Sequence, residues 1–128
     1  MDNISGKFIR VAVIFALVGM ALGIKMAISG VHDQTQAHAH INLLGWVTMM
    51  LYGLFYRSHE NAGQSRLALA HFWLSTLGAI VINVGVYLIY SDVPEGDPVA
   101  AVGSIATILG MATFAVIVFK NTGSDKPR

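Results

Sequence analysis

The chain has 128 residues, of which 55% are hydrophobic and only 12% charged, and its formal net charge is +1. A soluble globular domain carries about twice this share of charged residues, so the composition points to a membrane protein, and the small net charge leaves no basic footprint for nucleic acid. Because the chain has no cysteine, disulfides, iron–sulfur clusters and covalently attached c-type haem are excluded.

Four long stretches of the chain are nearly free of charged residues. A helix that crosses ~30 Å of hydrocarbon needs roughly 20 residues, and each stretch is long enough. In lipid, the backbone amides must find partners within their own segment, which favours helices over isolated strands. The sequence therefore predicts one domain, residues 1–128, that folds as an all-α integral membrane four-helix bundle. The expected helices cover residues 8–30, 34–57, 66–91 and 98–120, and Asp97 is placed to cap the last of them.

The distribution of cations predicts how the bundle is oriented. Lys25 is the one cation on the side of the first and third loops; the others fall on the opposite side, and are Lys7, Arg10, Arg57, Arg66, Lys120, Lys126 and Arg128. Short loops rich in Lys and Arg stay in the cytoplasm, so both termini are expected to be cytoplasmic. The second helix then begins near the periplasmic face.

Two histidines, His38 and His40, stand at the start of the second apolar stretch. Residues two apart on a helix point about 200° away from each other, so helical His38 and His40 would serve two different sites. Asn42 would then share the flank of His38, and Leu44 that of His40. If the chain is extended there, the two rings point the same way and could chelate one copper or zinc ion. Asp33 is a good N-cap residue just upstream, which favours the helical case.

Ionisable groups inside a membrane are candidates for functional sites. Histidines near helix ends also meet water at the membrane interface without any further role. The pair at fixed spacing, followed by an apolar run with Gly45 and Trp46, favours the functional interpretation.

The segment "HAHINLLGW" resembles the H-x-H-x-x-x-L-G-W segment of the haem–copper oxidase superfamily, in particular the catalytic subunit of its bacterial high-affinity branch and the related nitric oxide reductases. The close match covers about residues 37–56. In that family the segment opens the tenth of twelve helices, near the periplasmic face. By this resemblance His38 would bind the high-spin haem and His40 the low-spin haem.

The resemblance also implies an assembly and a location. The family's catalytic subunit consists of three four-helix arcs around a pseudo-threefold axis, and its histidine pair stands on the second helix of an arc, as it does here. The chain thus resembles one arc, and a homotrimer in the bacterial inner membrane would rebuild the ring. The implied cofactor is haem b with its iron, and the implied role is electron transfer or binding of a diatomic gas. Nothing in the chain matches the family's copper-binding histidines or its cross-linked His–Tyr pair, so reduction of oxygen is not implied. The electron donor, a quinone or another carrier, is not identified by the sequence.

The remaining polar residues have two interpretations each. Lys25 is either an anchor that reaches back to the membrane interface or a counter-charge for haem propionates. His71, near the cytoplasmic start of the third helix, is either a hydrogen-bonded residue at a helix interface or a group that handles protons or a quinone. Two small-residue stripes, Gly19-x-x-x-Gly23 and Ala106-x-x-x-Gly110, predict close helix packing, as a ring of subunits would require. A third possibility for the whole chain is an accessory subunit without a cofactor.

Overall fold

The computed structural model describes residues 3–123 and is all-helical over that range. Three of its helices are long and apolar enough to cross a membrane, which is consistent with a multi-pass membrane protein. The second expected helix, over residues 34–57, consists of three consecutive helical segments, α2, η1 and α3. In chain order the elements are α1 (Ile4–Ser29), α2 (Thr35–His40), η1 (Ile41–Val47), α3 (Thr48–Ser58), η2 (Ala62–Gln64), α4 (Arg66–Ile89) and α5 (Gly96–Asn121).

The segments α2, η1 and α3 form one uninterrupted helix, here named the composite helix, over residues 35–58. The backbone stays in the right-handed helical region at both junctions, with φ −60° at Ile41 and φ −62° at Thr48. The predicted span over residues 34–57 is therefore confirmed as helical.

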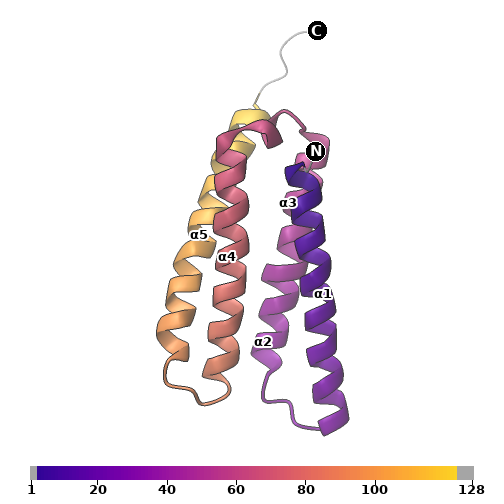
Figure 1. Cartoon of the computed structure of the whole chain (residues 1–128), viewed down its shortest axis with the longest axis vertical. Coiled ribbons are helices and arrows are strands. Elements are labelled where there is room, and N and C mark those ends of the chain that lie inside the picture. The colour runs from indigo at the N-terminus through magenta and orange to yellow at the C-terminus, as the bar shows by residue number, and fades with distance from the viewer. Residues whose placement is uncertain (1–2, 124–128) are drawn as a thin grey trace.

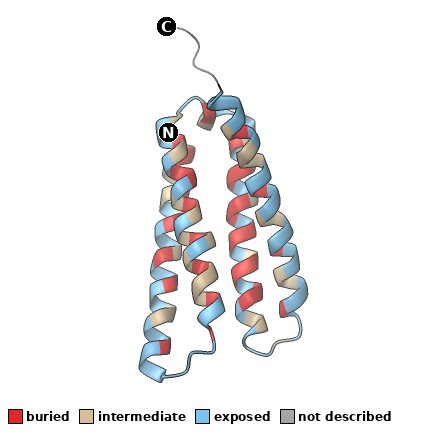
Figure 2. Ribbon diagram, turned by 180° about the vertical axis from the view of Figure 1, so that it is seen from behind, coloured by how far each residue is buried: buried red, intermediate tan, exposed pale blue. Residues whose placement is uncertain are grey.

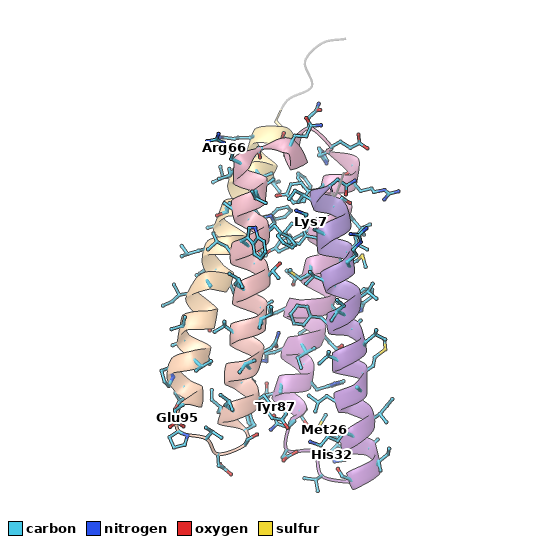
Figure 3. All side chains as sticks on the ribbon, viewed as in Figure 1. Lys7, Met26, His32, Arg66, Tyr87 and Glu95 are labelled. Carbon is cyan, nitrogen blue, oxygen red and sulfur yellow. The ribbon has the colours of Figure 1, made fainter. Side chains whose placement is uncertain are left out.

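The four helices form two antiparallel hairpins that stand side by side (Figure 1). One hairpin pairs α1 with the composite helix, and the other pairs α4 with α5. The described ends of the chain and η2 lie together at one end of the bundle, here named the terminal end. The loops that join α1 to α2 and α4 to α5 lie at the other end, here named the hairpin end. Lys7 and Arg66 lie at the terminal end, whereas His32 and Glu95 lie at the hairpin end (Figure 3).

The starts of the first and the last helix differ from the prediction. The first helix begins at Ile4 rather than residue 8, because the Asn3 side chain accepts a hydrogen bond of 2.6 Å from the Gly6 amide and so caps the helix four residues early. The last helix begins at Gly96, with Glu95 at the N-cap position and no side-chain cap. The prediction that Asp97 caps this helix is wrong, since Asp97 lies inside its first turn, where a negative charge favours the helix dipole.

Glycines allow the helices of each hairpin to approach closely. A Cβ atom on Gly19 would lie 2.6 Å from the Asn42 Oδ1 atom of the composite helix, and one on Gly110 would lie 2.5 Å from the Ser75 Oγ atom of α4. A Cβ atom on Gly103 would collide with the backbone nitrogen of Ile82. Both predicted small-residue stripes therefore pack within the chain. The stripes are therefore not free for the contacts between subunits that a ring was expected to make through them.

The core is densest in aromatic side chains at the terminal end. Phe8, Tyr52, Tyr56 and Phe72 form one buried cluster with His71 at its centre. The helix α4 is the most buried of the three long helices. Of the residues in its most apolar 18-residue stretch, 50% are buried, against 22% for α1 and 17% for α5. Its buried face is visible as the red stripe along one helix in Figure 2. Most of α5 is therefore left on the outside of the bundle.

Candidate site at the histidine pair

A π-helical segment follows directly after the histidine pair. The segment η1 covers Ile41–Val47, and the Thr48 hydroxyl donates a 2.6 Å hydrogen bond to the Leu43 carbonyl five residues earlier. In an α-helix, residues four apart drift by about 40° per step around the axis. The π-helix widens the turn, so that every fourth residue stays on the buried face; these are Ala37, Ile41, Gly45 and Met49. Such segments occur often at functional sites, and this one adjoins the candidate site.

The His38 ring packs against α1. Its Nδ1 atom lies 2.8 Å from the Gly19 carbonyl oxygen. Because a carbonyl can only accept a hydrogen bond, this contact puts the proton on Nδ1 and leaves Nε2 with its lone pair. A Cβ atom on Gly23 would lie 2.9 Å from the His38 Cε1 atom, so the His38 ring fits against α1 because position 23 has no side chain. The contact fixes both the tautomer and the orientation of His38.

Asn42 lies beside the same ring, as the helical interpretation predicts. Its Nδ2 atom donates a 3.0 Å hydrogen bond to the His38 carbonyl, and it stands 3.4 Å from both ring nitrogens. An amide N–H next to Nε2 is compatible with Nε2 as an acceptor. Asn42 would have to move for Nε2 to bind any other group.

The His40 ring leaves the composite helix on a different flank. Its Nδ1 atom lies 2.8 Å from the Gln36 carbonyl of the same helix, so Nδ1 again carries the proton and Nε2 keeps its lone pair. Leu44, expected on this flank, packs with Ala37 and with Ile82 of α4. His40 is only half-buried. The chain is helical at both histidines, so the extended conformation that a chelate by the pair requires is not the one adopted here.

The structure does not bring the other candidate residues to this pair. Lys25 is exposed on α1, and it lies two residues beyond Gly23, hence about 200° around the helix from the contact with His38. His71 lies near the terminal end of the bundle, so it does not share the depth of the pair, as expected. Within residues 3–123, no group of three or more His, Cys, Asp or Glu side chains could hold a metal ion.

A second polar pair, Tyr56 and His71, was not foreseen from the sequence. The Tyr56 Oη atom lies 2.8 Å from the His71 Nδ1 atom, and His71 is fully buried. The Phe114 ring stacks on His71 at 5.1 Å, and the Tyr52 ring meets its edge at 4.3 Å. The His71 Nε2 atom has no hydrogen-bond partner among the described residues. The hydrogen bond agrees with the first of the two interpretations of His71, that of a bonded residue at a helix interface. Both residues lie within one or two helical turns of the loop between α3 and α4, but the sequence alone does not show that their side chains face each other.

Comparison of the chain with protein-family models, with curated proteins and with solved structures found no match. The resemblance to the haem–copper oxidase segment therefore stands on the residues of that segment alone.

Proposed function

We propose that the protein is a membrane-bound b-type haem protein that acts in electron transfer or in binding a diatomic gas, with His38 and His40 as axial ligands supplied by different subunits. The proposed location is the bacterial inner membrane, with both termini in the cytoplasm. Haem, when bound, would supply the redox change or the site for the gas. The chain itself would supply imidazole nitrogens of fixed tautomer.

The observation that carries the proposal is that both imidazole rings adopt the same tautomer. In both histidines, Nδ1 lies 2.8 Å from a backbone carbonyl oxygen, and this leaves Nε2 as the nitrogen that carries the lone pair. Histidines that bind metals are usually held in this way, because the carbonyl orients the ring and raises its basicity. A histidine that only meets water at the interface has no need of such a partner. The donor chemistry of the pair therefore fits haem iron.

The geometry of the helix supports sharing between subunits. Two rings that diverge by about 200° on one helix cannot bind the two faces of a single haem. A homotrimer would let His38 of one subunit and His40 of the next meet at each interface. The resemblance to one arc of a three-arc subunit favours three copies over two.

Two rival functions remain to be separated from this one. A copper or zinc site that uses the pair as a chelate would require residues 38–40 to leave the helical conformation. An accessory subunit without a cofactor is favoured by one specific contact, because the bond from His38 to Gly19 also joins two helices and so has a structural use by itself.

The absorption spectrum of the purified protein tests the proposal most directly. Haem would give a Soret band and sharp bands on reduction, and bis-imidazole ligation would give a six-coordinate low-spin spectrum. A colourless protein that contains stoichiometric copper or zinc would support the chelate. A colourless protein free of metal, prepared from cells with ample haem, would support the accessory subunit.

A further inference from the structure

The cytoplasmic ends proposed above meet at the terminal end of the bundle, where a polar cavity of about 520 Å³ opens between the end of α3 and the end of α5. We name it the rim cavity; it is lined by residues 57–62 and by Asn121. Its volume lies within the range of about 300–1,000 Å³ that is typical of small-molecule sites. The apolar parts of both helices end beside it, so it lies where the headgroups of a bilayer would be.

Two opposite charges line the rim cavity without neutralising each other. Arg57 and Glu60 are three positions apart along the chain, and both line the cavity. Within residues 3–123, neither side chain forms an ion pair with the other or with a third group. A ligand with one positive and one negative group would therefore find a counter-charge for each.

Neutral acceptors stand beside Glu60 in the same wall. The His59 ring stacks on Phe55 with centroids 4.3 Å apart. Its Nδ1 atom lies 2.9 Å from the Ser58 Oγ atom, whose own proton goes to the Phe55 carbonyl oxygen, and 3.1 Å from that same carbonyl oxygen. Both contacts put the proton on Nδ1 and leave Nε2 as an acceptor. Asn121 donates its Nδ2 proton to the Ile117 carbonyl at 2.7 Å, and its Oδ1 atom is left as a second acceptor.

This set of groups matches a primary ammonium next to a phosphate. An ammonium has three N–H donors and no acceptor, and the wall offers the Glu60 carboxylate with acceptors from His59 and Asn121. A guanidinium binds phosphate oxygens through charge-assisted hydrogen bonds, and Arg57 offers one. Leu54, one turn before Arg57 on α3, is an exposed apolar side chain that an acyl chain can cover.

We propose that the rim cavity binds the headgroup of phosphatidylethanolamine, with Arg57 on the phosphate and Glu60 on the ammonium. Phosphatidylcholine has the same charges but no N–H donors, so it would lose the hydrogen bonds to Glu60 and to the neutral acceptors. Phosphatidylglycerol has no cation for Glu60. The site is independent of the histidine pair, which lies near the other end of the bundle.

Native mass spectrometry of the full chain in mild detergent tests this, with dioleoyl forms of the three lipids as probes. We expect phosphatidylethanolamine adducts to exceed phosphatidylcholine adducts by about tenfold, the ratio that corresponds to ~1.4 kcal/mol for the lost hydrogen bonds. Glu60→Gln removes the carboxylate charge but keeps an acceptor oxygen, so it should lower this ratio, and Arg57→Gln should weaken both adducts. Arg66→Gln, which removes a cation from the same end of the bundle but outside the cavity, should change neither.

Circular dichroism of each variant establishes that the helical fold is retained, so that a lost adduct reports on the site. Equal binding of phosphatidylethanolamine and phosphatidylcholine by the native chain would overturn the proposal. A preference for phosphatidylglycerol would also overturn it, because it would mark a simple anion site. So would a preference for phosphatidylethanolamine that Glu60→Gln leaves unchanged.

Discussion

The His38 ring and the Gly19 carbonyl are joined by a 2.8 Å hydrogen bond across the contact between the composite helix and α1. The bond forms because α1 has glycine at positions 19 and 23, where any side chain would collide with Asn42 or with His38. A small-residue stripe that would otherwise serve only helix packing thus also determines the tautomer of a candidate ligand.

Substitution Gly23→Ala tests whether this packing controls the site. The added methyl group would lie 2.9 Å from the His38 Cε1 atom, so the ring must move. Alanine also favours a helix by about 1 kcal/mol over glycine, which offsets part of the steric cost. We expect thermal stability to change little while the low-spin haem spectrum is lost or weakened. Gly63→Ala is the matched control, because its nearest non-local atom would be 3.5 Å away. An unchanged spectrum in Gly23→Ala would mean that the packing of His38 against Gly23 does not control haem ligation.

Removal of either histidine should change the haem spectrum. If the proposed ligation is correct, His38→Ala and His40→Ala each delete one axial nitrogen, so each variant should lose haem or convert it from low-spin to high-spin. His32→Ala is the control, since His32 is exposed in the loop before the composite helix. The measurement is the spectrum of oxidised and reduced protein, with haem counted per chain. A variant at His38 or His40 that keeps the native low-spin spectrum would remove that residue from the list of ligands.

Much of the fold follows from hydropathy, because a lipid-facing helix must be both apolar and long. The four predicted spans are all helical, and the largest boundary error is at the start of α1, where the Asn3 side chain caps the helix. The π-helix at Ile41–Val47 was beyond sequence reasoning, which assumed a single helical period. It arises where buried residues recur every fourth position, and this spacing fits a wider turn than the α-helix.

The candidate site was predictable only in part. The divergence of His38 and His40 followed from helical spacing, and Asn42 was expected on the correct flank. The partners of the two rings were not predicted, since both are backbone carbonyls, which every residue carries. The bond between Tyr56 and His71 depends on how α3 and α4 face each other across a loop, and a single sequence does not reveal this facing.

The Tyr56–His71 bond should contribute measurably to stability. Tyr56→Phe removes the hydroxyl and leaves the His71 Nδ1 atom buried without its partner, which costs about 1–3 kcal/mol. The double variant Tyr56→Phe with His71→Phe removes both polar partners, so it should be less destabilised than the sum of the two single variants. Thermal unfolding in detergent measures both effects. Tyr90→Phe, at an exposed position, is the control. If the destabilisation of the double variant equals the sum of the destabilisations of the two single variants, the two side chains do not interact.

The charge asymmetry makes a prediction about topology. The described ends of the chain lie at one end of the bundle (Figure 1), together with Lys7, Arg57, Arg66 and Lys120. By the positive-inside rule this end should face the cytoplasm. A reporter that is active only in the periplasm should be silent when fused after Arg128 and active when inserted in the loop between α4 and α5. The reverse pattern would invert the proposed orientation.

Shared ligation makes the sharpest prediction about assembly. In a closed ring each interface can pair His38 of one subunit with His40 of the next, a heterologous contact that repeats around the axis. The glycine stripes pack within the chain, so the interface must use other surfaces, such as the exposed Leu43, Val47 and Leu51 on the composite helix. We expect three chains and three haems per particle in mild detergent.

Co-expression of two defective chains tests the sharing itself. A chain with His38→Ala still supplies His40, and a chain with His40→Ala still supplies His38, so an interface between them in the correct order has both ligands. Random mixing of equal amounts makes about one interface in four complete, because a heterologous interface has a direction. The mixture should therefore regain about a quarter of the native low-spin haem, while each variant alone has none. Mass measurement of the native protein in the same detergent gives the number of chains. A dimer with one haem would replace the ring by two-fold pairing of like histidines, and a haem-loaded monomer would exclude shared ligation altogether.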